Sequence, residues 1–320
     1  MIGRLSFRAP WLGPLAALVL LYLLLAALAG QTFATAETMR TMIRQTTMVG
    51  IGSLGMTMII ILGGIDLSIG SVIALTTVVV AIALSAGWPP LAAALIGVTA
   101  AGLCGLMNGA IITGLRVQPF IVTLGAMGLI RGAAKGLAHE QKVDAPLTWL
   151  NGLLAALGPG ERWQIVPPGV WILVVLTIVV AGVLRYTPFG RYVFAIGSNE
   201  ETARVCGVRI NLVKLTVYTS ASMLVGLAGV MQFARLSVGD PTVAYGFELD
   251  CIAAVVIGGG ALSGGDGSIL GTLIGAMLMT EIRTGCTHLG LSVWIQEMIT
   301  GLIIVMAVAV DRLRHRRATG

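Results

Sequence analysis

The chain has 320 residues, of which 57% are hydrophobic and only 11% are charged, whereas an ordinary soluble domain carries roughly 25% charged residues. This composition excludes a typical soluble protein and predicts a polytopic membrane protein. The net charge of +6 does not indicate nucleic-acid binding, because the basic residues are scattered and no stretch interleaves them with aromatic residues.

Apolar windows long enough to cross a bilayer recur along the whole chain. The first follows Arg4 and Arg8 and precedes "ATA", which resembles a signal-peptidase site, but its length matches a full crossing and predicts a retained helix. The window at 249–262 is the shortest and contains Asp250. The sequence predicts an all-α protein with ten spans, at 11–30, 43–62, 69–86, 91–115, 118–137, 168–184, 211–234, 249–262, 268–285 and 291–310.

The basic residues support this count and predict the orientation. Ten spans with the N-terminus inside place 1–10, 116–117, 185–214 and the tail 311–320 in the cytoplasm, with both termini on that side, and place the long loop 139–169 in the periplasm. The positive-inside rule is then obeyed. The cytoplasmic segments hold twelve of the 20 basic residues: Arg4, Arg8, Arg116, Arg185, Arg191, Arg204, Arg209, Lys214, Arg312, Arg314, Arg316 and Arg317.

Glycines at four-residue spacing indicate close helix packing, as in "GLMNG" (105–109), "GLIRG" (128–132) and "GTLIG" (271–275). Two longer segments, "GGIDLSIG" at 63–70 and "GGGALSGGDGSILG" at 258–271, resemble each other and each joins one span to the next. Paired interruptions of this kind often mark the transport pathway.

A carboxylate at Asp66 between two apolar runs needs compensation, because a charge is costly inside a membrane. Either Asp66 or Ser68 caps the following helix, or both residues also line a hydrated path for a polyhydroxylated solute. The sequence leaves both interpretations open. The candidate pathway residues carry neutral amide or hydroxyl groups, apart from the one carboxylate: Asp66, Ser68, Asn108, Gln118 and Thr123.

The segment 185–214 contains a predicted short helix on the cytoplasmic side. We expect Pro188 and Gly190 to end the preceding span, Ser198 and Glu201 to form a capping box, and Gly207 to close the short helix. An amphipathic connector is the alternative interpretation of this helix.

Five stretches together make the chain resemble the permease subunit of the ribose, xylose and arabinose type of bacterial ABC sugar importers. In order they are "GGIDLSIGS", "MNGAIITGLRVQPFIVTLGAMGLIRG", "GRYVFAIGSNEETARVCGV", "VGLAGVMQFARL" and "VIGGGALSGGDGSILGTLIGA". The resemblance implies one multi-pass permease domain (1–320) in the bacterial inner membrane.

The same resemblance implies partners and a coupling site. A separate ATPase subunit would dock on the cytoplasmic side, a periplasmic sugar-binding protein would dock on the segments 139–169 and 235–250, and a second permease would complete the pore. The coupling element would map onto the helix after "AIG", at Gly197, Ser198, Asn199, Glu200, Glu201, Ala203 and Gly207.

The sequence contains no P-loop pattern, no Cys/His cluster with metal-ligand spacing and no cofactor motif, so we expect a transport subunit rather than an enzyme. Two alternatives stay open. One is a permease for nucleosides or branched-chain amino acids. The other is an ion-coupled secondary carrier, in which Asp66 would bind the coupling cation or proton.

Overall fold

A computed structural model describes residues 11–157 and 165–319. Its helices are α1 (Leu12–Ala29), α2 (Ala36–Ile61), α3 (Ile69–Ser85), α4 (Pro90–Leu115), α5 (Pro119–Leu137), α6 (Pro168–Tyr186), α7 (Pro188–Ser198), α8 (Glu200–Val205), α9 (Ile210–Leu236), α10 (Phe247–Ile257), α11 (Ile269–His288) and α12 (Val293–Thr319). Two short 3-10 helices, Gly30–Thr32 and Trp149–Leu153, and a two-stranded antiparallel sheet of β1 (Val143–Asp144) and β2 (Val238–Gly239) complete the described chain.

Each of the ten predicted windows coincides with a helix, and six of the helices are long and apolar enough to cross a membrane: α1, α4, α5, α6, α9 and α11. The eighth window corresponds to the shortest of these ten helices. Helix α10 has only 11 residues, which at about 1.5 Å per residue reach roughly half of a hydrocarbon core of about 30 Å. The chain then turns at Gly258 and continues through a glycine-rich loop, so the prediction of a full crossing at 249–262 was wrong.

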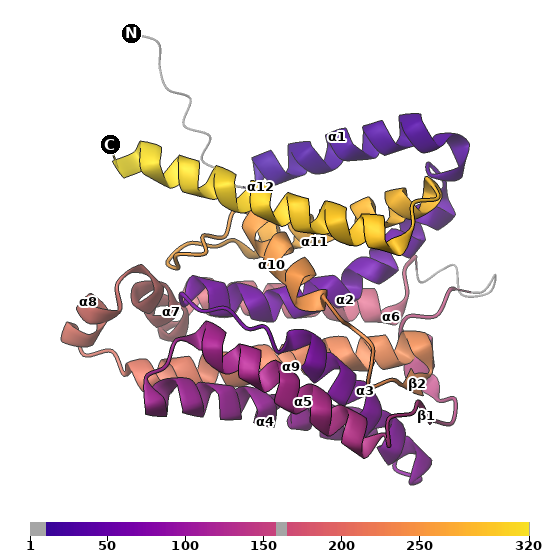
Figure 1. The fold of residues 1–320 in the computed structure, drawn as a ribbon, viewed down its shortest axis with the longest axis horizontal. Helices are drawn as coiled ribbons and strands as arrows, with labels where there is room; N and C mark the ends of the chain where they lie inside the picture. Colours follow the sequence, from indigo (N-terminus) through magenta and orange to yellow (C-terminus); the bar gives the residue numbers. More distant parts are fainter. Residues whose placement is uncertain (1–10, 158–164, 320) are drawn as a thin grey trace.

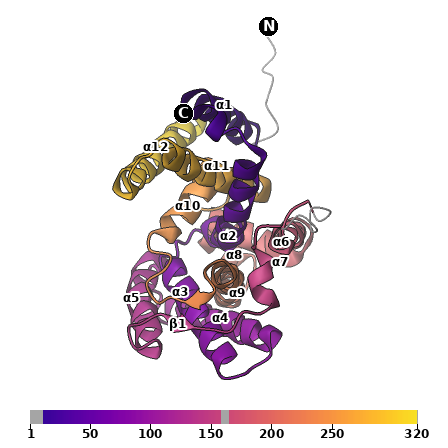
Figure 2. The same cartoon turned by 90° about the vertical axis from the view of Figure 1, so that its right-hand side faces the viewer.

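The long helices lie side by side in Figure 1, with α7 and α8 at one end of the bundle and the sheet at the other. We call these ends the α8 end and the β end. Helix α2 occupies the centre, where it contacts α6, α9, α10 and α11 (Figure 2). Its residues from Thr46 to Ile61 are all buried. In Figure 1 α12 finishes on the side of the α8 end, whereas α1 begins near the middle of the view and runs toward the side of the β end. Residues 1–10, the predicted cytoplasmic N-terminus, lie outside the described residues.

The connection from α6 to α9 differs from its prediction in two respects. Pro188 begins a new helix instead of ending the span, because proline is favoured in the first turn, where its missing N–H is not needed, and Gly190 lies inside this helix, α7. Ser198 is the last residue of α7, so it does not form a capping box with Glu201. Asn199 caps α8 instead, since its side-chain oxygen accepts a hydrogen bond from the N–H of Thr202 at 2.8 Å.

The segment 139–169, predicted as one long loop, contains β1, the 3-10 helix Trp149–Leu153 and the first residues of α6. Strand β1 pairs with β2, which follows α9 directly, so that Val143 lies opposite Gly239. The side chain of Asn151 also donates a hydrogen bond to the Ser237 hydroxyl at 2.9 Å. These contacts fix the loop against the β end of α9.

Candidate functional site

Helix α8, which we call the lever, is held on one side and exposed on the other. Ala203 is buried, whereas the Glu201 side chain is 79% exposed. Glu200 bonds to Lys214 at 2.7 Å and to Arg204 at 3.3 Å, which joins α8 to the first turn of α9. Gly207 follows the helix with φ +82°. The carboxylates in the first turn of α8 also face the positive end of the helix dipole.

Gly197, at the end of α7, lies against two other segments of the chain. A Cβ added at Gly197 would overlap the carbonyl oxygen of Ile61 and come within 2.7 Å of the N–H nitrogen of Gly265. A Cβ added at Gly264 would come within 2.7 Å of the Gly197 carbonyl oxygen and 2.9 Å of Gly63 Cα. The two similar segments, 63–70 and 258–271, therefore meet at the end of α7. We call the contact of Ile61, Gly63, Gly197, Gly264 and Gly265 the glycine junction.

The segment that follows the junction holds a buried polar cluster. Asp66, only 2% exposed, accepts hydrogen bonds from the Ser68 N–H at 2.8 Å and from the Ser68 hydroxyl at 2.6 Å. Asn108 on α4 donates to the Ser68 hydroxyl at 3.1 Å. Ser68 precedes α3 without a side-chain capping bond, so neither Asp66 nor Ser68 is the side-chain cap that the sequence suggested. Asp66 instead fixes the turn that leads into the helix.

Two other predicted pathway residues lie at different places. Thr123 on α5 is buried and donates to the carbonyl oxygen of Ile65 at 3.1 Å, so it holds the backbone of the cluster segment. Gln118 precedes α5 and lines a groove at the α8 end together with Arg116, Glu200 and Arg209. The structure brings Asp66, Ser68 and Asn108 into one hydrogen-bonded chain, with Thr123 beside it and Gln118 apart.

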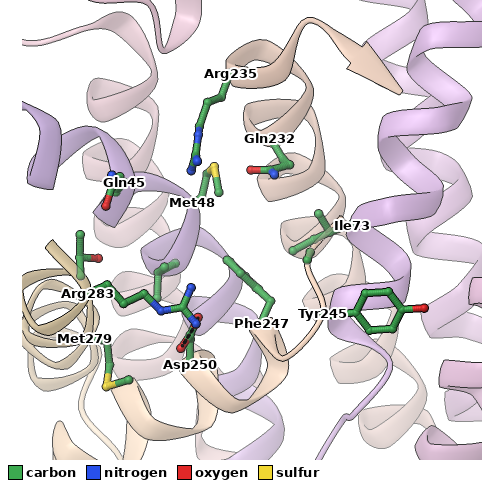
Figure 3. Close-up of a pocket in the computed structure, with 13 residues that line it drawn as sticks. Gln45, Met48, Ile73, Gln232, Arg235, Tyr245, Phe247, Asp250, Met279 and Arg283 are labelled. Atoms are coloured by element: carbon green, nitrogen blue, oxygen red, sulfur yellow. Dashed lines mark hydrogen bonds and ion pairs between the residues drawn. The ribbon is translucent and has the colours of Figure 1, made fainter. Parts of the chain in front are cut away.

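A cavity of about 230 Å³ lies toward the β end, between α2, α3, α9, α10 and α11 (Figure 3). Its central pair is Asp250, whose side chain is 1% exposed, and Arg283, which bonds to it at 2.7 Å. The amides of Gln45 and Gln232 and the guanidinium of Arg235 also face the cavity. Amide, carboxylate and guanidinium groups together can donate to and accept from hydroxyl groups of a small solute.

Sequence reasoning did not assign this cavity, although its residues carried a usable signal. Arg235 and Arg283 lie at or near the ends of predicted spans, and Asp250 lies inside one. Ionisable residues in such positions are functional candidates by default. The sequence alone does not show how the helices pack. Only this packing brings Arg235, Asp250 and Arg283 from three separate spans to one cavity.

The loop after α9, at the β end, contains a second carboxylate, Asp240. Burial pushes the pKa of Asp240 upward, but hydrogen bonds from the Thr242 hydroxyl and N–H and the nearby ammonium of Lys142 outweigh this effect, so the pKa lies below its usual 3.8. Lys142 approaches the carboxylate at 3.4 Å. This pair connects the residues after α5 to those after α9. Among the described residues no group of His, Cys, Asp and Glu side chains is arranged to hold a metal ion.

The bundle of apolar helices, six of which are long and apolar enough to cross a membrane, is that of a multi-pass membrane protein. More specifically, the chain belongs to the family described as the permease component of the branched-chain amino acid transport system, whose model matches residues 38–308.

Curated relatives match almost the full chain. The ribose import permease protein of Escherichia coli (strain K12) is 37% identical over 315 residues, 98% of each chain. The fructose import permease protein of Rhizobium meliloti is 32% identical over 303 residues, 93% of this chain and 84% of the relative. The L-arabinose ABC transporter permease protein of Azospirillum brasilense is 32% identical over 303 residues, 94% and 88% of the two chains. No solved structure matches. The protein is therefore a multi-pass inner-membrane permease, as the resemblance implied.

Proposed function

We propose that this chain is the membrane subunit of a binding-protein-dependent ABC importer that carries a monosaccharide, a pentose or hexose, into the cytoplasm. The observation that carries the proposal is the 37% identity to a ribose import permease over nearly both chains. Relatives named for fructose and arabinose support the same substrate class. A separate subunit supplies energy by hydrolysing ATP, so this chain transmits movement and catalyses no reaction itself.

A permease for branched-chain amino acids is the second candidate, because the description of the family names that substrate. The two candidates differ in the binding protein that delivers the solute. They share the fold, the lever and the junction. We prefer the sugar because each of the three curated relatives described above is named for a sugar.

In the proposed orientation the α8 end faces the cytoplasm. The described segments at this end are rich in basic residues, among them Arg116, Arg185, Arg191 and Arg209, as the positive-inside rule requires. The described parts of the connections from α5 to α6 and from α9 to α10 then face the periplasm, where β1 and β2 and the Lys142–Asp240 pair hold them together for docking of the binding protein. Residues 247–250 of the predicted docking segment 235–250 belong instead to α10. With α10 as a half-length element, ten helices serve as the proposed membrane segments.

The lever works, in this proposal, as a rigid link from the ATPase to the pathway. The exposed face of α8 around Glu201 is the docking surface, and Asn199, Glu200 and Gly207 fix its shape. Movement of α8 passes along α7 to Gly197 and Ser198. Gly197 contacts the end of α2 and the loop before α11, so displacement of one helix end acts on both segments. Close packing makes such contacts switch between discrete arrangements rather than deform smoothly.

The proposed pathway residues are Asp66, Ser68, Asn108 and Thr123, with Gln118 toward the α8 end. All but Gln118 are buried in the described arrangement. Their hydrogen-bonded chain begins three residues beyond Gly63, so movement at the junction would open the cluster and present its oxygens and amide to the sugar.

A second copy of the chain is proposed to pack against α5. Gly128, Gly132 and Gly136 follow one another at four-residue spacing, and a Cβ at each would meet no atom within 4 Å. Ile121 and Leu129 on the same helix are exposed. Helix backbones approach closely at such positions in membranes, so disulfide trapping of Gly132→Cys between two copies tests this contact.

Reconstitution tests the proposal as a whole. Proteoliposomes that contain the chain, its ATPase and its binding protein should accumulate the sugar only with internal ATP. Glu200→Lys with Glu201→Lys should abolish uptake and weaken ATPase docking while the protein stays in the membrane. Accumulation by the purified chain alone on an ion gradient would refute the importer and support the secondary carrier.

A further inference from the structure

A groove of about 600 Å³ lies at the α8 end between α6, α7 and the first turn of α11. Its walls are apolar and come from all three helices. Leu184 from α6, Phe194 from α7 and Leu270 from α11, the last 59% exposed, all line it. We call it the arginine groove, because Arg185 and Arg191 line it beside Ala181.

The two arginines of the groove, Arg185 and Arg191, have no acidic partner among the side chains that the structure describes. Other basic residues at this end differ in that respect, since Arg204 and Lys214 both bond to Glu200. Two exposed guanidinium groups therefore border an apolar groove with no acidic side chain paired to them in the described part of the chain. Guanidinium groups bind phosphate in a fixed, bidentate geometry.

Aromatic residues place the arginine groove at the level of a membrane surface. Tyr186, 76% exposed, and Tyr192 each follow one of the two arginines in the sequence, and the Arg185 guanidinium lies 5.5 Å from the centre of the Tyr186 ring. Tyrosines and long basic side chains gather where a spanning helix meets the headgroup region. The preceding part of α6 exposes apolar side chains such as Ile178, as a lipid-facing helix does.

We infer that the arginine groove binds an anionic glycerophospholipid of the inner leaflet, with its phosphate at Arg185 and Arg191 and an acyl chain along Leu184, Phe194 and Leu270. Basic pockets between membrane helices on the cytoplasmic side bind headgroups of this class. The lipid would bridge α7, which ends at the glycine junction, and α11, which begins just after it. Membrane composition would thus act on the same contact that the lever moves.

Native mass spectrometry of the full chain, purified from bilayers that contain phosphatidylcholine and phosphatidylglycerol, tests the inference. We expect phosphatidylglycerol to remain bound to the wild-type chain. Arg185→Gln with Arg191→Gln should lower its retention by about tenfold or more, since each basic residue near a membrane surface contributes roughly a fivefold step. Ala181→Trp, which fills the groove and keeps both charges, should lower retention as well.

Arg116→Gln with Arg209→Gln is the matched control, because it removes two charges from the same end of the bundle at a groove that also contains Glu200. Equal loss in this control would show diffuse surface charge and overturn the site. Equal retention of both lipids by the wild type, unchanged retention in Ala181→Trp, or displacement by soluble glycerol phosphate as effective as by lipid would overturn it too. The inference rests on the proposed membrane orientation alone, so a failed sugar-uptake experiment would leave this result standing.

Discussion

The backbone N–H of Gly265 donates a hydrogen bond to the carbonyl oxygen of Ile61 at 2.9 Å. This bond joins the last residue of α2 to the loop that precedes α11, and Gly197 from the end of α7 lies against both of its partners. A single contact thus connects the lever to two segments that interrupt the membrane helices. The hydrogen bond also satisfies one carbonyl group at the end of α2, where helices leave such groups without internal partners.

Gly197→Ala should disrupt this contact. The new methyl group would overlap the Ile61 carbonyl oxygen, so the backbones must separate at an expected cost of about 1–3 kcal/mol, as in other overpacked sites. We expect a lower melting temperature of the purified chain and a loss of ATP-driven uptake.

Gly114→Ala is the control for this prediction, because a Cβ at Gly114 meets no atom within 4 Å. Alanine is the better helix former by about 1 kcal/mol, so the control should leave stability unchanged or raise it. If both substitutions had the same effect, the close contact at Gly197 would have no special role.

The sequence predicted the positions of the helices well, because long apolar windows leave few alternatives to a membrane helix. It could not predict the junction, since the contact of Gly63, Gly197 and Gly264 depends on three segments far apart in the chain. The similarity of 63–70 to 258–271 was visible, but their direct contact was not. The length of helix α10 was overestimated, because the apolar window continues past Ile257 whereas the glycines at 258–260 end the helix.

The predicted caps of α8 and α3 were wrong because of local hydrogen bonding at the starts of these helices. Ser198 and Asn199 are both good capping residues, and only the end of α7 determines which of the two is free to cap. Similarly, Asp66 and Ser68 bond to each other rather than to the first turn of α3. The pathway candidates were chosen by side-chain type, and the structure joins three of the five in one cluster.

Asp66→Ala should destabilise the cluster more than Asp66→Asn. Alanine leaves the buried Ser68 N–H and hydroxyl without their acceptor, at an expected cost of about 1–3 kcal/mol, whereas the amide oxygen of asparagine can still accept. Thermal unfolding of the two variants measures the difference. Should Asn and Ala lower uptake equally while only Ala lowers stability, the carboxylate charge itself is required for transport.

The Asp250–Arg283 pair should respond asymmetrically to substitution. Arg283→Met leaves a buried carboxylate without its partner, and breaking a buried pair in this way costs about 3 kcal/mol, less here because the Arg283 side chain is 45% exposed. Asp250→Asn leaves only a partly exposed guanidinium and should cost less. Adding Asp250→Asn to Arg283→Met should restore stability, and a double variant no more stable than Arg283→Met alone would show that the pair is not the stabilising feature.

Asp240 makes the stability of the loop at the β end depend on pH. Its pKa lies below 3.8 because Thr242 and Lys142 stabilise the charged form against the effect of burial, so the folded state binds this proton less readily than the unfolded chain. The stabilisation is therefore complete above the ordinary pKa and is lost as pH falls through the lower folded value. Melting temperatures of the wild type and Asp240→Asn should differ near neutral pH and converge in acid, at a pH well below the ordinary aspartate pKa of about 3.9. Ser85, whose hydroxyl donates to the carbonyl oxygen of Asp144 in the same region, carries no charge to titrate, and Ser85→Ala should lower the melting temperature equally at both pH values. A difference between wild type and Asp240→Asn that persists unchanged into strong acid would mean that the carboxylate's charge does not hold β1 and β2 together.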